Sequence, residues 1–259
     1  MSNLENGNEA ATPAREAAQN VRELEHDLIR AISGGETADL AGQQVEADTI
    51  RRIIIGQMPG CVVSPFGVRI RNAEITGRLD LEGADVPFPL SFTKVTMMTA
   101  GQNGSIVARD ARIRRLNVSN STFAGGIVAD RAHFENGIII AGGRLGGPLL
   151  VRGAEIGGAL SMEGTHLGDG KSALLAAGAR ISGPLVLRRA RVRGEVRIQR
   201  AHLTAGLRAE ELKITEDGAG LYADAARIGG DVLLTQAQVV GAVRFENATV
   251  RGGFAARNL

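Results

Sequence analysis

The sequence predicts an all-β solenoid, a parallel β-helix of about 8.5 four-sided coils with a small helical cap at its N-terminal end. Two observations predict this class. An 11-residue pattern runs through residues 63–259, and the 259-residue chain is 44% apolar but only 3% aromatic, with 35 glycines. An interior filled by small and branched aliphatic side chains at regular spacing is typical of repeat proteins rather than of ordinary globular enzymes.

The repeat is strict in the positions that it reserves for apolar side chains. Counting back from Leu259 in steps of 11 gives 17 units, and position 6 is large and apolar in all of them. Position 2 is apolar in every unit except the first, and position 11 is Ala in 11 of the 17. No charged residue occupies positions 2, 6, 8 or 11, whereas Arg, Glu and Gln gather at positions 1, 7, 9 and 10. We expect the first group to face the interior.

The spacing of the inward positions predicts the shape of a coil. Two-residue steps are the alternation of a strand, and the longer steps between them indicate corners, where glycines such as Gly77, Gly157 and Gly230 relieve positive φ or crowding. Two units then close one four-sided coil, and stacked coils form a rod about 40 Å long. Short insertions at 98–102, 169–171 and 216–218 all fall in even-numbered units, so we expect them at one corner.

The segment that precedes Val63 does not follow the repeat. Residues 1–13 are polar and predict a disordered tail, and residues 14–62 predict a cap. Apolar residues at helical spacing predict a helix over 14–32, and the segment 38–45 is strand-like. The segment 48–55 predicts a short helix with Asp48 or Thr49 as its N-cap. A cap is expected there because a terminal coil otherwise exposes its core and an unpaired strand edge.

Several segments resemble the five-residue unit of pentapeptide-repeat proteins. They are A-E-I-T-G at 73–77, A-E-I-G-G at 154–158 and A-R-I-G-G at 226–230, although alternate sides have six residues and a large apolar residue in place of Ala. The resemblance covers about three-quarters of the chain, and it implies a right-handed quadrilateral β-helix that is often dimeric through its C-terminal coils. Some members of that bacterial family mimic DNA with acidic surfaces and inhibit gyrase. A looser similarity is to bactofilins, β-helical scaffolds that polymerise end to end. Similar bacterial repeat proteins sometimes carry an oxidoreductase label.

Composition predicts a cytoplasmic protein. A single cysteine, Cys61, excludes an intramolecular disulfide framework and favours a reducing compartment. The N-terminal sequence lacks the basic and apolar regions of a signal peptide, and no apolar run is long enough for an integral membrane segment. The net charge of +2 divides into −5 over residues 1–60 and +7 over residues 61–259.

One segment concentrates positive charge. Residues 188–200 read RRARVRGEVRIQR, with six Arg and one Glu. They predict a surface for an anionic macromolecule or a protein partner, and the alternative is a solvated face with interleaved acids. The predicted surface consists of Arg188, Arg189, Arg191, Arg193, Arg197 and Arg200.

The chain offers no recognisable catalytic, cofactor or metal site. His133, His166 and His202 occupy an outward position, and the parity of their units places His166 on a different side from the other two, so they are expected to be surface residues that share no metal. Cys61 has no obvious His partner and is expected to pack in the cap. Without long loops to build a cleft, neither an enzyme nor a small-molecule substrate is expected.

The final unit, 249–259, is a full repeat with apolar residues at its core positions. We expect these residues to form an end of the core that no further coil covers. We therefore expect a homodimer through this coil, with a filament second because head-to-tail growth would displace the cap. The function predicted is a non-enzymatic scaffold that self-associates. The alternatives are a polyanion-binding protein, a gyrase-type inhibitor and a member of an oxidoreductase-labelled family. The predicted interface consists of Phe245, Val250, Phe254 and Leu259.

Overall fold

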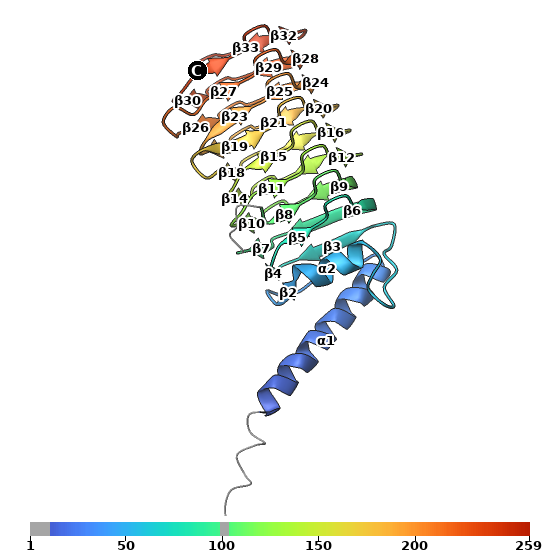
Figure 1. Cartoon of the computed structure of the whole chain (residues 1–259). Coiled ribbons are helices and arrows are strands. Elements are labelled where there is room, and N and C mark those ends of the chain that lie inside the picture. Colours follow the sequence, from blue (N-terminus) through green and yellow to red (C-terminus); the bar gives the residue numbers. More distant parts are fainter. Residues whose placement is uncertain (1–10, 99–103) are drawn as a thin grey trace, which may run out of the picture.

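The computed structural model, which describes residues 11–98 and 104–259, confirms the predicted fold class. Parallel strands stack into a solenoid of about eight turns with helices at its N-terminal end (Figure 1). In each coil the chain passes through four faces in a fixed order, here named I to IV. Each strand pairs with the strand of the same face in the preceding coil. Faces I and II belong to one 16-stranded sheet because β6 (Asp85–Thr93) and β9 (Arg112–Asn117) run through the corner between them.

The other strands of each face follow one another at one per coil. Face I contains β12 (His133–Phe134), β16 (Glu155–Ile156), β20 (Arg180–Ile181), β24 (His202–Leu203), β28 (Arg227–Ile228) and β32 (Thr249–Val250). Face II contains β1 (Ala38–Asp39), β3 (Val68–Arg71), β13 (Ile138–Ile139), β17 (Leu160–Ser161), β21 (Leu185–Val186), β25 (Gly206–Arg208), β29 (Asp231–Leu233) and β33 (Phe254–Ala255). Face III contains β2 (Gln44–Glu46), β4 (Glu74–Thr76), β7 (Thr96–Met97), β10 (Thr122–Phe123), β14 (Arg144–Leu145), β18 (His166–Leu167), β22 (Arg191–Val192), β26 (Lys213–Ile214) and β30 (Gln238–Val239). Face IV contains β5 (Leu79–Asp80), β8 (Ile106–Val107), β11 (Ile127–Val128), β15 (Leu149–Leu150), β19 (Ser172–Leu175), β23 (Glu195–Arg197), β27 (Leu221–Tyr222) and β31 (Val243–Arg244).

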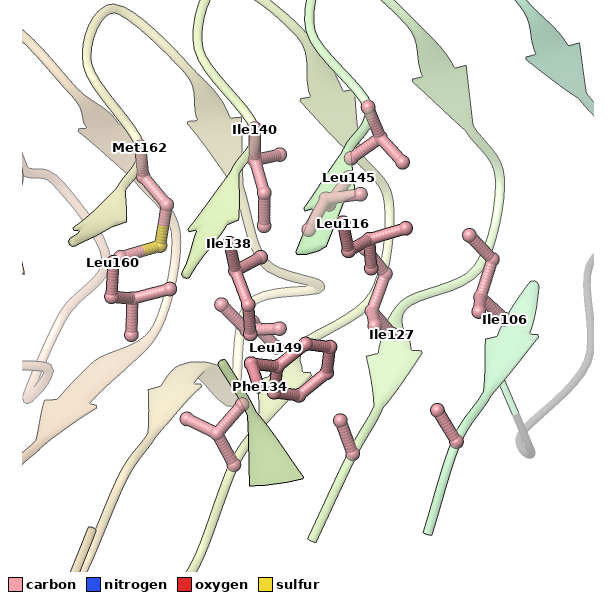
Figure 2. Close-up of a cluster of buried hydrophobic side chains, with 14 of the residues drawn as sticks. Ile106, Leu116, Ile127, Phe134, Ile138, Ile140, Leu145, Leu149, Leu160 and Met162 are labelled. Atoms are coloured by element: carbon pink, nitrogen blue, oxygen red, sulfur yellow. The ribbon is translucent and has the colours of Figure 1, made fainter. Parts of the chain in front are cut away.

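The core is a set of apolar columns that run along the rod. Ile138, Leu160 and Leu185 lie directly above one another in face II and are fully buried. Figure 2 shows Ile138, Leu149 and Leu160 among the buried side chains of neighbouring strands. Position 6 is buried in every coil up to Val232, as the repeat predicts. Because each residue stacks on its counterpart in the next coil, the same small set of side-chain volumes fills every layer.

Buried polar side chains at position 11 find partners in the preceding coil. The hydroxyl of Ser121 donates to the carbonyl oxygen of Phe92 at 3.0 Å and accepts from the backbone N–H of Val95 at 3.1 Å. Thr165 donates to the carbonyl oxygen of Ile140 at 2.8 Å. These bonds explain how Ser and Thr replace Ala at an inward corner without leaving an unsatisfied group.

The corners use glycine for both of the predicted reasons, positive φ and crowding. The left-handed conformation lies mainly at position 10, where non-glycine residues such as Arg131 (φ 56°) and Ala225 (φ 55°) adopt it. Gly77 does have a positive φ of 82°. Gly157 and Gly230 do not, but a Cβ on either would approach a backbone oxygen of the preceding coil to 2.2 Å. At those two corners glycine is therefore required by close approach of the backbones.

The N-terminal elements differ from the prediction in their boundaries. Helix α1 spans Ala11–Ser33, so it begins before the expected start at residue 14, and residues 1–10 of the predicted tail lie outside the described residues. The strand-like segment 38–45 splits into β1 and β2, which pair with β3 and β4. The solenoid therefore begins within the segment predicted to be the cap.

The insertions lie at one corner, as expected. Strands β7, β18 and β26 precede them on face III, and β8, β19 and β27 follow them on face IV. Most of the first insertion falls within 99–103, outside the described residues.

Helix α2 (Ala47–Ile54) covers the N-terminal end of face IV. It follows β2 and packs on β5, where Arg51 Nε donates to the carbonyl oxygen of Asp80 at 2.9 Å. Ile50 and Ile53 are buried in the core. Glu46 occupies the N-cap without a side-chain hydrogen bond, so the predicted capping by Asp48 or Thr49 is wrong. The guanidinium of Arg51 thus gives the carbonyl oxygen of Asp80 a hydrogen-bond donor, which the backbone of a neighbouring strand would otherwise supply.

We predict that the two residues of β21 differ in how strongly the same charge destabilises the protein. Leu185→Asp should lower the free energy of unfolding by about 4 kcal/mol or more, because it buries an unpaired carboxylate. Val186→Asp is the matched control: its side chain points outward and is only partly buried, so the loss should be about 1 kcal/mol. Denaturant titration of both variants measures the difference. Equal stabilities would contradict the inward assignment of position 6.

Candidate functional site

The six arginines of the predicted binding surface wind around the rod. Arg188 and Arg189 lie after face II and both donate to Glu163 Oε1, at 2.6 and 2.5 Å. Arg191 and Arg193 lie on or beside face III. The segment 188–200 covers more than half of a coil, so neighbours in sequence point in different directions. The structure does not bring the six together.

The remaining two arginines lie on the far side of this coil. Arg197 belongs to β23 on face IV, where it pairs with Glu195 at 2.5 Å and lies over the ring of Tyr222. Arg200 lies at the corner that leads to face I and adopts the left-handed conformation. Of the predicted surface, only Arg191 and Arg193 share a face.

A different set of basic residues stacks on face III. Arg144, His166, Arg191 and Lys213 occupy the outward position of four consecutive strands, in direct register. Adjacent parallel strands are about 4.8 Å apart, so the four form a column about 14 Å long. We call this column the basic ladder. Neutral residues, Thr122 and Gln238, continue the register at its two ends.

A groove of about 380 Å³ runs beside the basic ladder. Gly146 and Gly168, which follow the inward residues of β14 and β18, have no side chains to fill it. Arg193 and Thr215 occupy the same position in the next two coils and line the groove further along. None of the described residues that line it is acidic. The groove is therefore a basic channel parallel to the rod.

The charges of the basic ladder are largely uncompensated. In the part of the chain that the structure describes, the side chains of Arg144 and Lys213 have no hydrogen-bond or ion-pair partner. Arg191 contacts only the ring of His166, through Nη1 and Nε2 at 3.3 Å. Arg193 pairs with Glu216 at 3.4 Å. Like charges on adjacent strands destabilise a sheet, so the neighbours Arg191 and Lys213 retain a repulsion that an anion would relieve.

His166 responds to its position between two arginines. Burial, followed by the charges of Arg191 and Arg144, holds the pKa of His166 below its ordinary value of 6.5. At neutral pH the imidazole is then mostly uncharged, so its Nε2 can accept the hydrogen bond from Arg191. The sequence prediction treated His166 as an ordinary surface residue. The missed signal was register along the rod, since its two neighbours in the ladder each lie one full coil away in the chain.

Face I carries a comparable column that is neutralised in part. Glu155 lies between His133 and Arg180 in register and contacts them at 3.4 and 3.3 Å. Other outward acids are bound in the same way: Asp130 accepts from Arg152, with Nη2 to Oδ2 at 2.5 Å. The expected separation of His166 on one side from His133 and His202 on another is confirmed. Beyond Arg180, His202 and Arg227 continue the face I column without an interleaved acid, as on the ladder. Face III adds the groove beside its column.

The C-terminal end is a second distinctive surface. Strands β30 to β33 each end a face, so every face presents an unpaired edge there. Phe254 and Leu259 are 53% and 54% exposed, whereas Phe245 and Val250 pack against the core and are partly buried. The rings of Phe245 and Phe254 meet edge to face with centroids 5.3 Å apart. The four residues of the predicted interface thus surround the uncovered end of the core.

Other chemistry is limited in the described residues. No group of three or more His, Cys, Asp or Glu residues is placed to hold a metal ion within 11–98 and 104–259. Neither described helix is long and apolar enough to cross a membrane. Cys61 is partly buried against the core, with its Sγ 3.9 Å from the hydroxyl of Ser33.

Comparison with known proteins yields no match to a family model, a curated protein or a solved structure. The resemblance to pentapeptide-repeat proteins and to bactofilins therefore stays a prediction. Function is inferred from the two surfaces described above.

We predict that the pKa of His166, measured by NMR titration, lies below 6.5 and rises when Arg191 is changed to Gln. Arg180→Gln on face I should leave it unchanged. Because the unfolded histidine binds a proton more readily, stability should fall as the pH drops from the unfolded pKa toward the folded one. If the pKa of His166 is the same in the Arg191→Gln variant as in the wild type, the charge of Arg191 does not act on the imidazole.

Proposed function

We propose that this protein is a non-enzymatic scaffold that forms a homodimer through its C-terminal coil. The exposed apolar core of that coil carries the proposal. Val232 and Ala237 are fully buried, whereas their counterparts one coil later, Phe254 and Leu259, are more than half exposed. Burying a large apolar side chain contributes about 1.5–3 kcal/mol, so a cover for this end is favoured.

The polar groups of the same end support self-association. Val232 and Leu234 donate their backbone N–H groups to Gly253 and Ala255 in the last coil. The equivalent donors of the last coil point away from the rod, toward the place of a further coil. A two-fold contact brings the same end of two copies together, so it covers both apolar patches and both sets of strand edges at once.

The N-terminal end favours a closed dimer over a filament. Helix α2 covers β5, and both helices lie at the N-terminal end of the rod (Figure 1). Leu28 and Ile32 of α1 are fully buried in the core. Head-to-tail growth would have to displace these helices and the Arg51 hydrogen bond to Asp80. The dimer requires no such rearrangement.

A scaffold role fits the rest of the surface. The outward acids Asp130 and Glu163, which a hydrolytic mechanism would need free, are bound by arginines. A rod with rigid, stacked coils presents fixed surfaces at a fixed spacing to partners. We place it in the cytoplasm on the strength of its single cysteine.

Light scattering on the full chain tests the dimer. We predict a mass of twice the 27.1 kDa chain at micromolar concentration. Phe254→Asp should reduce the mass to that of a monomer, because two carboxylates would be forced together at the centre of the contact. Phe254 is 53% exposed, so the substitution should leave each monomer folded.

Phe66→Asp is the matched control. Phe66 is 65% exposed near the N-terminal end, so a dimer of C-terminal ends should tolerate the change. If the light-scattering mass falls to that of a monomer in both variants, the association is head-to-tail instead. A wild-type protein that remains monomeric would contradict self-association altogether.

A further inference from the structure

The basic ladder has no role in the proposed dimer, since it lies along face III and ends before the last coil. We propose that the face III groove binds an extended oligophosphate chain, with its phosphate groups lying along Arg144, His166, Arg191 and Lys213. The proposal rests on the register of the four strands, the groove beside them and the absence of acids among the described residues that line it.

The shape of the site favours a linear ligand. The four donor positions recur at about 4.8 Å along the rod, because they lie on successive strands of one parallel sheet. A single phosphate can reach only one or two of them. A chain that carries a charge on each unit can contact several neighbouring positions at once and gains affinity from each added contact.

The chemistry of the donors favours phosphate. Arginine offers paired N–H groups that match phosphate oxygens, and lysine adds a compact positive charge. The side chains of Arg144 and Lys213 have no partner among the described residues, so phosphate would not have to displace an existing ion pair. Arg193, which also lines the groove, is already held by Glu216 at 3.4 Å.

The lining of the groove argues against nucleic acid. Non-specific single-strand binding relies on aromatic side chains on which bases stack, and no aromatic residue lines this groove in the described structure. A channel of about 380 Å³ can hold only a small part of a DNA duplex, so a duplex would contact the ladder mainly from outside the groove. A thin chain without bases fits the channel better.

His166 gives the site a dependence on pH. Arg144 faces it from β14, and Arg191 and Arg193 from β22 and the turn after it, while Lys213 lies one strand further. A bound phosphate would offset these positive charges and favour protonation of the imidazole. Binding should therefore tighten as the pH is lowered from about 8 to about 6, through the range in which histidine titrates.

Isothermal titration of the full-length protein with inorganic tripolyphosphate tests the proposal. We expect tripolyphosphate to bind about tenfold or more tightly than orthophosphate, with an affinity that falls as salt is raised. The triple variant Arg144→Gln, Arg191→Gln, Lys213→Gln should weaken binding by about 100-fold, since each change removes a charge-assisted hydrogen bond. His166→Gln should reduce the dependence on pH.

A second triple variant controls for net charge. Arg112→Gln, Arg180→Gln and Arg227→Gln remove three charges from the equivalent outward position of face I. We expect this variant to bind tripolyphosphate as the wild type does, and circular dichroism melting should show both triple variants folded.

Three results would overturn the proposal. Equal losses in the two triple variants would mean that only net charge matters. Equal affinity for a sulfated oligosaccharide of the same charge would remove the preference for phosphate. Equally tight binding of a DNA duplex, with the same sensitivity to the face III variant, would assign the ladder to nucleic acid.

Discussion

The hydrogen-bond ladder between coils is the constraint on which the rest of this structure depends. Each short strand bonds to its counterparts in the coils before and after it. A strand so short is not stable alone, and it persists because every layer repeats the same path at about 4.8 Å. Coil length is therefore nearly constant along the rod, and extra residues are tolerated only at the corner between faces III and IV.

The ladder also arranges the surface. Outward side chains stack as regularly as inward ones, so many charges meet partners one coil away, although Arg197 pairs with Glu195 within its own strand. The ion pairs Arg131–Asp110, Arg152–Asp130 and Arg188–Glu163 have separations of 21, 22 and 25 residues. On face III, the side chains of the basic ladder lack such acidic partners among the described residues. At the C-terminal end, apolar side chains that are buried in earlier coils are exposed. Each departure leaves an interaction to be completed from outside, by an anion in one case and by a second copy in the other.

The fold could be predicted from the sequence because the inward positions of the repeat accept almost only apolar or small residues. The columns through Leu160 and Leu185, and the corner that takes the insertions, follow from counting in steps of 11. The basic ladder could not be found by searching for local runs of charge, since each member lies a full coil from the next. The start of α1 and the uncapped start of α2 depend on tertiary packing, which overrides local capping preferences. The left-handed corners at residues such as Ala225 were hidden because the surrounding ladder imposes that conformation on unfavourable residue types.

Hydrogen exchange of the backbone amides tests the stacked ladder most directly. The amides of Leu160, Met162 and Leu187 donate to the next coil, to Pro184, Val186 and Arg208. A stack of coils predicts that such amides exchange slowest, at the rate of global unfolding, and that protection recurs once per coil at equivalent positions of the same face. Protection that does not recur in this way, or that is lost from mid-rod strands before the helices, would contradict a solenoid held together by bonds between coils.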